Sequence, residues 1–136
     1  MNKNLDKQIE KFFQSKAFGV VGASSDRKKY GNKVLRCYLQ HDKEVYPVHN
    51  TEQTIEGLSC INFIKNLPQQ VESISIVTPP EVTTKIVLTA VGTNIKNIWM
   101  QPGADSDEAV SICKQNKINV IYGGSCVLVT LGFDGS

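Results

Sequence analysis

Apolar and polar positions follow two different periods along this chain, and their alternation is the first guide to its fold. Residues 3–14 place Leu5, Ile9, Phe12 and Phe13 on one face, which predicts an amphipathic helix. Short apolar runs rich in Val and Ile come next, separated by longer segments. These runs predict strands at residues 17–22, 44–48, 74–77, 95–100 and 118–122.

Three of the segments between these strands carry apolar residues at helical spacing. The three faces consist of Val34, Leu35, Tyr38 and Leu39, then Val82, Ile86, Val87, Ala90 and Val91, and finally Ala109, Val110 and Cys113. Asp105 and Glu108 have the spacing of a capping box for the third helix. We expect a short strand at residues 56–60 and a short helix at residues 61–66.

Strands that alternate with helices predict βαβ units and a parallel sheet that is covered on both faces. We expect an α/β fold with a doubly wound parallel sheet of five to six strands. The chain has no internal repeat, low-complexity tract or linker, so residues 1–136 are predicted to form one domain.

Ligands of such sheets bind beyond the carboxyl ends of the strands, at the topological switch point. Four predicted strand ends carry glycine, proline or polar residues at that edge. They are Gly22-Ala23-Ser24, Val48-His49-Asn50, Thr78-Pro79-Pro80 and Gln101-Pro102-Gly103. We interpret them together as one binding site.

The first strand ends in small residues, Gly22-Ala23-Ser24-Ser25, ahead of a basic loop and a helix. Small residues let the backbone approach a phosphate closely, and the next helix directs free N–H groups and its positive end toward the anion. We therefore expect backbone N–H groups and the Ser24 hydroxyl to bind phosphate. The loop carries Arg27, Lys28 and Lys29, of which at least one is expected to reach it.

The identity of the nucleotide is less sharply defined by these residues. The first turn has the spacing Gly19-x-x-Gly22-x-Ser24, so neither the dinucleotide fingerprint nor a Walker sequence is present. His49 and Asn50 occupy the strand end where NAD sites place an acidic residue, and Glu52 lies past that point. With the basic loop nearby, this favours a phosphorylated ribose, as in NADP or coenzyme A (CoA).

Composition narrows the choice of partners. The formal net charge is only +2, which does not suggest a nucleic-acid partner. No apolar run is long enough to cross a membrane, and the polar N-terminus lacks a signal-peptide core, so we expect a cytoplasmic protein. The four cysteines form no C-x-x-C pair and no zinc spacing with the two histidines, so no metal site is predicted. Cys37 and Cys113 are expected to be buried free thiols.

The phosphate turn also resembles a known family. Gly22-Ala23-Ser24 with residues 29–35 (Lys-Tyr-Gly-Asn-Lys-Val-Leu) is similar to the opening motif of the small stand-alone CoA-binding domain proteins. Those proteins are similar in fold to the CoA-binding domain of the succinyl-CoA synthetase α subunit. The likeness continues in order through Tyr46-Pro47-Val48, Ile55-Glu56-Gly57, Ile76 to Pro80, Trp99 to Ala104 and Cys126 to Val129.

This resemblance implies a Rossmann-like, three-layer α/β/α domain that binds CoA and has no established catalytic residues. Two departures concern the site. Val48-His49-Asn50 replaces the usual Val-Asn-Pro, and Gly124-Ser125-Cys126 replaces Gly-Pro-Cys. A further departure, Asp42-Lys43, stands where a glycine commonly precedes the second strand.

Together, the strand ends and the resemblance predict where CoA binds. The ADP phosphates are expected at the N-terminus of the first helix after the turn, beside Lys29, which matches the family's lysine. The 3′-phosphate is expected near the basic loop or His49. Pantetheine is expected to run past Thr78-Pro79-Pro80, with its end near Gln101-Pro102-Gly103. The full predicted set is Gly22, Ala23, Ser24, Ser25, Lys29, Tyr30, Val48, His49, Asn50, Thr78, Pro79, Pro80, Gln101, Pro102 and Gly103.

We expect a module that binds CoA or a short acyl-CoA without catalysis, as a carrier, sensor or regulator. One alternative is an NADP-dependent oxidoreductase, but neither Tyr30 nor Tyr122 is placed as its proton donor. A second is an interaction domain that has kept the fold without the nucleotide. Cys126 is interpreted as inert, with a mixed disulfide to the CoA thiol as the rival hypothesis. A homodimer is compatible with the sheet edges, although no motif specifies one, and no protein partner is indicated.

Overall fold

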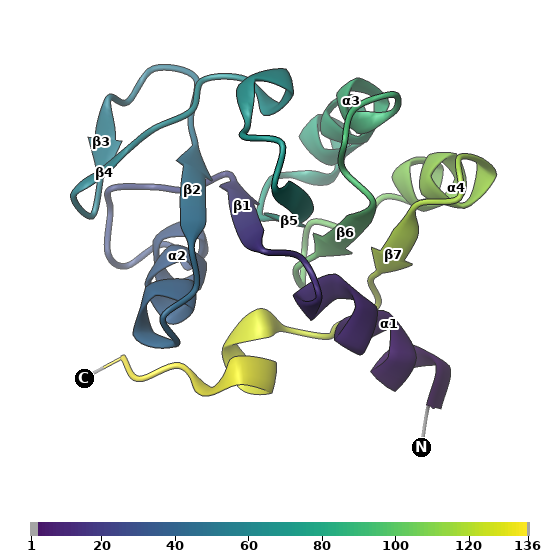
Figure 1. Ribbon diagram of the computed structural model, residues 1–136, viewed down its shortest axis with the longest axis horizontal. Coiled ribbons are helices and arrows are strands. Elements are labelled where there is room, and N and C mark those ends of the chain that lie inside the picture. The colour runs from purple at the N-terminus through teal and green to yellow at the C-terminus, as the bar shows by residue number, and fades with distance from the viewer. Residues whose placement is uncertain (1–2, 136) are drawn as a thin grey trace.

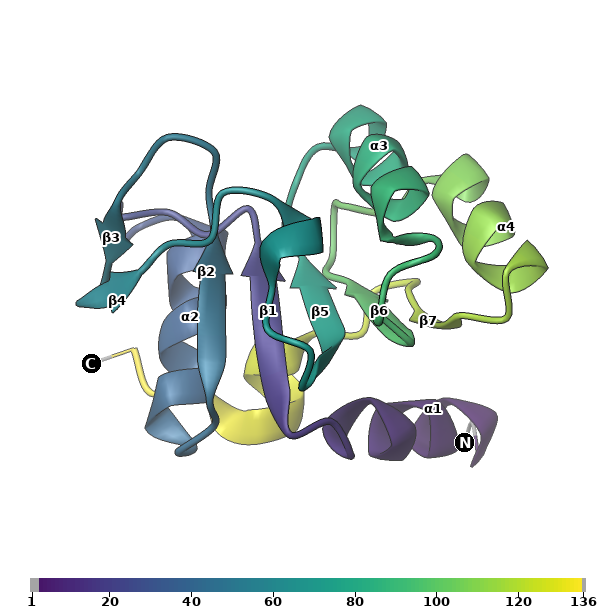
Figure 2. The same cartoon turned by 45° about the horizontal axis from the view of Figure 1, so that its top comes forward.

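A computed structural model describes residues 3–135 as a sheet between two layers of helices (Figures 1 and 2). The helices are α1 (Lys3–Phe13), α2 (Tyr30–Gln40), α3 (Pro80–Ala90) and α4 (Asp107–Gln115), with a short 3₁₀ helix η1 (Ile64–Asn66) and a π-helical segment η2 (Leu128–Gly132). The strands are β1 (Ala17–Val21), β2 (Val45–Val48), β3 (Thr54–Ile55), β4 (Leu58–Ser59), β5 (Val71–Ile76), β6 (Asn97–Met100) and β7 (Asn119–Ile121).

Five strands form one parallel sheet in the order β2-β1-β5-β6-β7, which confirms the doubly wound, Rossmann-like prediction. The chain leaves β1 toward β2 on one side and returns to β5 on the other side of β1. The switch point therefore lies at the carboxyl ends of β1 and β5. Val21 is in register with Val48 of β2 and Ile76 of β5, so these three strands end level with one another.

The two faces of the sheet are buried by separate apolar clusters. One face packs against α1, α2 and the segment around Val127, and the other packs against α3, α4 and η1. Every residue of β1 and β6 is buried, and β1 accordingly reads as a continuous apolar run. Trp99 of β6 is fully buried and packs edge-on against Phe12 of α1, so it is a core residue.

The region after β2 differs from the predicted pattern. Residues 56–60 do not form one strand, because Glu56 and Gly57 make the two-residue turn of a hairpin between β3 and β4. Both have a positive φ, 51° and 78°, as a tight hairpin turn of this hand requires. The helix expected at residues 61–66 shrinks to the single turn of η1.

The start of α4 is also capped differently. Ser106, not Asp105, is its N-cap, and its hydroxyl accepts a hydrogen bond from the Ala109 N–H at 3.1 Å. Asp105 lies one residue too early for this role, and its carboxylate accepts from the Gly123 N–H at 2.8 Å. The capping-box prediction is therefore wrong, because the N-cap of α4 is Ser106, one residue after the predicted Asp105.

The cysteine prediction is confirmed. All four cysteines are free, and Cys37 and Cys113 are fully buried. Burial raises the pKa of each of these two thiols to about 11, so both stay protonated at neutral pH.

The role of Ser106 as the N-cap of α4 can be tested by mutation. We expect Ser106→Ala to lower the free energy of unfolding by about 1 kcal/mol, because it removes the acceptor for the Ala109 N–H. Urea denaturation would measure this. Glu108→Ala, which would remove the reciprocal acceptor of a capping box, is the control and should cost less than half as much. A larger cost for Glu108→Ala than for Ser106→Ala would contradict the assignment.

Candidate functional site

Two glycines bring the turn after β1 against the start of α2. Gly22 has a φ of +94°, and a Cβ there would lie 2.3 Å from the Val77 carbonyl oxygen. A Cβ on Gly31 would lie 2.0 Å from the Gly22 carbonyl oxygen. Real Cβ atoms do not approach backbone this closely, so β1, α2 and the end of β5 meet backbone to backbone at this point.

A buried amide holds the same turn from the other side. Asn32 of α2 is fully buried, and its Nδ2 donates to the Ser24 carbonyl at 2.8 Å and to the Glu56 carboxylate at 3.0 Å. Its Oδ1 accepts from Arg36 Nε at 2.7 Å. The β3–β4 hairpin supplies Glu56, so the hairpin contributes to the conformation of the turn.

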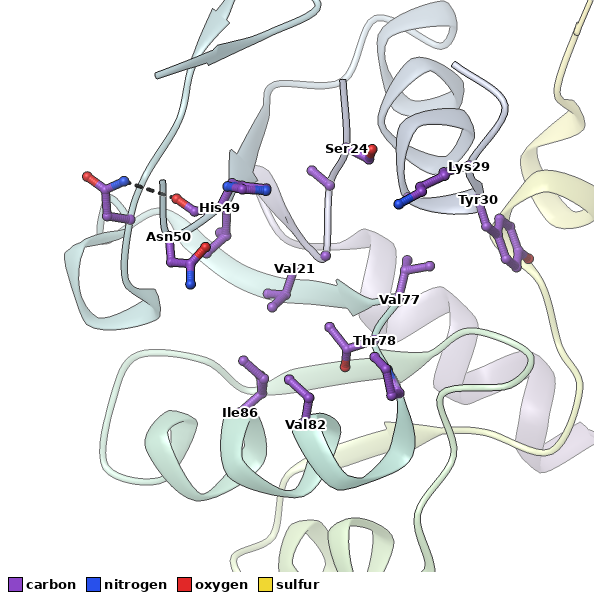
Figure 3. Close-up of a pocket in the computed structure, with 16 residues that line it drawn as sticks. Val21, Ser24, Lys29, Tyr30, His49, Asn50, Val77, Thr78, Val82 and Ile86 are labelled. Atoms are coloured by element: carbon purple, nitrogen blue, oxygen red, sulfur yellow. Dashed lines mark hydrogen bonds between the residues drawn. The ribbon is translucent and has the colours of Figure 1, made fainter. Parts of the chain in front are cut away.

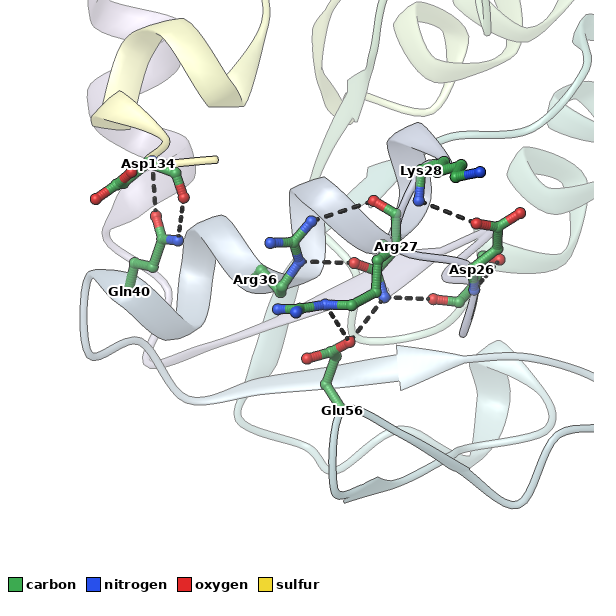
Figure 4. Close-up of polar contacts among 9 residues, drawn as sticks. Asp26, Arg27, Lys28, Arg36, Gln40, Glu56 and Asp134 are labelled. Atoms are coloured by element: carbon green, nitrogen blue, oxygen red, sulfur yellow. Dashed lines mark hydrogen bonds and ion pairs between the residues drawn. The ribbon is translucent and has the colours of Figure 1, made fainter. Parts of the chain in front are cut away.

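The same glutamate pairs with Arg27 of the basic loop (Figure 4). Arg27 Nε lies 3.4 Å from the Glu56 carboxylate, and Arg36 Nη2 donates to the Arg27 carbonyl at 3.2 Å. Lys28 is exposed and does not line the cavity described below. Of the three predicted basic residues, Lys29 alone reaches that cavity.

The N-terminus of α2 keeps its donors free. Lys29 is the N-cap, and within residues 3–135 no side chain caps this end. The first N–H groups of a helix have no acceptor inside it, and the helix dipole makes this end positive. The uncapped N–H groups at the start of α2 therefore lie beside the turn after β1. The Ser24 oxygen accepts the Asp26 N–H at 3.1 Å, which leaves the hydroxyl hydrogen free to donate.

This volume opens into a cavity of about 610 Å³ at the carboxyl ends of β1, β2 and β5 (Figure 3). The cavity lies at the switch point, where the sequence placed the ligand. Most of the predicted residues line it: Gly22, Ala23, Ser24, Lys29, Tyr30, Val48, His49, Asn50, Thr78 and Pro79. Lys29 carries the one formal charge among its described lining side chains, if histidine is neutral.

Five predicted residues do not line the cavity. Ser25 lies at its rim and donates to Glu52 at 3.3 Å, and Pro80 is the first residue of α3. Gln101 is fully buried, and its Oε1 accepts the Val127 N–H at 2.9 Å, which fastens the C-terminal segment to β6. Pro102 and Gly103 follow Gln101 in the turn before α4. The contacts of these five residues with the ligand stay predictions.

His49 has a defined hydrogen-bonding role at one end of the cavity. Its Nδ1 accepts the N–H groups of Thr51 at 3.1 Å and Glu52 at 2.9 Å. In the neutral ring the hydrogen therefore lies on Nε2, which leaves a donor on the other ring edge. The Asn62 amide donates to the His49 carbonyl at 3.0 Å and so fixes this strand end.

Tyr30 lies on the opposite side of the cavity from His49 (Figure 3). The Tyr30 hydroxyl is hydrogen-bonded to the Cys126 thiol, which is half-buried. Burial and then the bond to Cys126 raise the pKa of Tyr30 well above its ordinary value, so the phenol is protonated at neutral pH.

Sequence reasoning missed several residues of the site. Val82 and Ile86 of α3 form part of the apolar wall, although their periodicity indicated only a core-facing helix. Asn62 had no signal, because it belongs to an irregular segment. Asn32 and Glu56 stood in the quoted motifs, but their contacts join parts of the chain that only the fold brings together.

Two features are absent from the part of the chain that the structure describes. No group of three His, Cys, Asp or Glu side chains in this part of the chain could hold a metal ion. No helix within it is long and apolar enough to cross a membrane.

The whole parallel sheet lies within a region of the chain that matches a protein-family model. Residues 16–132 match the model of the CoA binding domain. The chain belongs to the CoA-binding domain family. This match contains the β1–α2 turn, the three strand ends that line the cavity and the C-terminal segment.

Characterised relatives are longer proteins. The alpha subunit of ADP-forming acetate–CoA ligase II from Pyrococcus furiosus is 26% identical over 91 residues, which are 66% of this chain and 20% of the relative. ADP-forming acetate–CoA ligase I from Archaeoglobus fulgidus is 29% identical over 79 residues, which are 58% of this chain and 12% of the relative. The chain thus matches a fifth or less of these proteins.

The fold is shared by a solved structure of similar length and by one of a much longer protein. A conserved hypothetical protein from Pyrococcus furiosus is 35% identical, with a TM-score of 0.80 over 85% of this chain and 98% of its own. The dinucleotide-forming acetyl-coenzyme A synthetase 1 of Candidatus Korarchaeum cryptofilum is 24% identical, with a TM-score of 0.73 over 85% of this chain and 27% of its own. The second likeness concerns the fold alone.

The glycine contact gives the first prediction about the site. We expect Gly31→Ala to lower the free energy of unfolding by about 3 kcal/mol, because its Cβ would overlap the Gly22 carbonyl. Chemical denaturation would measure the loss. Gly92→Ala is the control: its φ is +84° but its Cβ would meet open space, so it should cost about 1 kcal/mol. Equal costs for the two variants would argue against the backbone contact.

Proposed function

We propose that this protein binds CoA or a short acyl-CoA without transforming it, as a carrier, sensor or regulatory module. One observation carries the proposal. A glycine turn and an uncapped helix N-terminus open into the switch-point cavity of a chain that belongs to the CoA-binding domain family.

In this proposal the diphosphate lies against the β1–α2 turn. Backbone N–H groups of the turn and of the first turn of α2 donate to its oxygens, and Lys29 adds a positive charge. Val21, Val82 and Ile86 give the hydrocarbon part of the ligand an apolar wall to bury. The polar strand end at His49 and Asn50 faces the nucleoside.

The proposal assigns no catalytic residue. Acetate–CoA ligase activity is named for relatives of which this chain matches 20% and 12%. In the cavity, the Nδ1 atom of His49 is occupied by two backbone donors, and Tyr30 is paired with Cys126. Neither arrangement supplies a nucleophile activated by an adjacent base, which is why we favour binding over catalysis.

A matched pair of lysine variants tests the proposal. We expect saturable one-to-one binding of CoA in isothermal titration calorimetry. Lys29→Ala should raise the Kd about tenfold, because a charge-assisted contact with phosphate is lost. Lys28→Ala, one residue away but outside the cavity, removes the same charge and should change the Kd by less than about twofold.

Thermal melts with different nucleotides separate the rival functions. CoA and acetyl-CoA should raise the melting temperature more than NADPH does, because only the site's own ligand binds the native state strongly. A larger shift with NADPH would favour the oxidoreductase alternative. No shift with any of the three nucleotides, and no calorimetric heat with CoA, would favour the nucleotide-free interaction domain.

A further inference from the structure

Two cysteines and a tyrosine meet where the C-terminal segment passes α2. In both views η2 lies beside α2 (Figures 1 and 2). Cys37 of α2 is fully buried, and its thiol donates to the Val127 carbonyl at 3.9 Å across 90 positions of the chain. Cys126 comes directly before Val127, and its thiol is hydrogen-bonded to the Tyr30 hydroxyl. Adjacent residues of this segment therefore contact Cys37 and Tyr30 of the same helix.

The electrostatic surroundings of the three groups agree with one cluster. Tyr30 and Cys37 lie on the same face of α2, because two helical turns contain about seven residues. Burial is the main cause that raises the pKa of Cys37, and the neighbouring Cys126 adds to it. The pKa of Tyr30 is raised by burial and by Cys126, and to a smaller extent by Cys37. The two thiols and the phenol therefore share one small region.

The other two cysteines lie elsewhere. Cys113 belongs to the apolar cluster on the opposite face of the sheet from the cluster that contains Cys37. Cys60 follows the β3–β4 hairpin and lies near Glu52. A disulfide requires Cα atoms within about 7 Å of one another. Of the four cysteines, Cys37 and Cys126 are the pair whose surroundings meet.

The two thiols differ in their access to solvent. Cys126 is half-buried in the loop between β7 and η2, so a small oxidant can reach its sulfur. Cys37 is fully buried, and its pKa of about 11 keeps the thiol protonated, which makes it a poor first target for an oxidant. Oxidation is therefore expected to begin at Cys126.

The backbone on both sides of Cys126 is fastened. The Trp99 indole donates to the Ser125 carbonyl at 3.0 Å, and the Gln101 side chain accepts the Val127 N–H at 2.9 Å. A rotation of the Cys126 side chain about its Cα–Cβ bond is then the movement that takes its sulfur from one partner to another.

We propose that Cys126 and Cys37 form a disulfide in response to a hydroperoxide. Hydrogen peroxide oxidises the Cys126 sulfur to a sulfenic acid, which breaks the O–O bond and releases one water. The Cys37 sulfur then attacks the Cys126 sulfur. An S–S bond forms, the S–O bond breaks, and the hydroxyl leaves with the Cys37 proton as a second water. The two thiols are oxidised by two electrons in total, and the peroxide is reduced.

Peptide mapping tests the disulfide directly, because each cysteine lies on its own tryptic peptide. These peptides are residues 37–43, 44–65, 97–114 and 118–136. Reduced, ligand-free protein would be treated with one equivalent of hydrogen peroxide, alkylated and digested without reductant. We expect the main oxidised product to join residues 37–43 to residues 118–136, with the mass of the two peptides less two hydrogens. A reductant should separate them again.

Three variants assign the order of the steps. Cys37→Ala should abolish the crosslink and leave a sulfenic acid on Cys126 that dimedone traps. Cys126→Ser should also abolish it and leave Cys37 unmodified. Cys60→Ser removes the other half-buried thiol and is the control, which should give the same crosslink as the unaltered protein. A crosslink through Cys60, a disulfide between two molecules, or oxidation of Cys126 without a crosslink in the unaltered protein would overturn the proposal.

The disulfide has a consequence for the cavity, and this step rests on the proposed function. Tyr30 lines the cavity and loses its sulfur partner when Cys126 turns toward Cys37. Because the phenol is then less firmly placed, the oxidised protein should bind acetyl-CoA about fivefold more weakly than the reduced protein in calorimetry. Acetyl-CoA is the probe because it has no free thiol to open the disulfide.

The outcomes separate the two proposals. An equal Kd for the oxidised and reduced forms would refute the effect of the disulfide on the cavity. A peptide map without the crosslink between Cys37 and Cys126 would refute the disulfide itself, whatever the protein binds. No binding of acetyl-CoA or CoA to the reduced protein would refute the proposed function and leave the disulfide to be judged by the peptide map.

Discussion

The contact between the backbones of Gly22 and Gly31 is the constraint on which the site depends. It sets how closely the end of β1 approaches the start of α2, and the parallel contact of Gly22 with the Val77 carbonyl sets the distance to the end of β5. With a side chain at either glycine, these elements would separate. The close approach of the turn, the start of α2 and the end of β5 beside the cavity is therefore a consequence of one tightly packed point.

Around this point lies a polar network whose centre is the buried Asn32. Asn32 connects Ser24 of the turn to Glu56 of the hairpin, and Glu56 in turn holds Arg27. An unpaired amide at the depth of Asn32 would be costly, and its donors and its acceptor are paired within the network. Arg27 is paired with Glu56 and does not line the cavity, although its side chain is 65% exposed. The remaining positive potential comes from Lys29 and the N-terminus of α2, which suits a diphosphate better than a cluster of separate phosphates.

Much of the fold was predictable because it rests on local periodicity and on small residues at strand ends. The strands, the long helices and the glycine turn all leave such signals, and the structure confirms the sheet. The differences arise where long-range contacts decide. Glu56 adopts a positive φ without being glycine, and Gln101 is buried because its amide meets the Val127 N–H, 26 residues away. The engagement of Arg27 by Glu56 likewise depends on where the hairpin folds, which a charge run in the sequence does not disclose.

The cavity has two chemically different ends, and the segment around Cys126 lies beside one of them. Trp99 Nε1 donates to the Ser125 carbonyl at 3.0 Å, and Gln101 binds Val127, so Cys126 is held between two fixed neighbours beside Tyr30. At the opposite end of the cavity lie the polar side chains of His49 and Asn50 (Figure 3). A ligand bound through its diphosphate at the central turn has one arm on each side of that turn. Under the proposed function, the recognition of adenosine at one end leaves pantetheine to extend toward Tyr30 and Cys126 at the other, so the polarity of the cavity determines the direction in which the ligand lies.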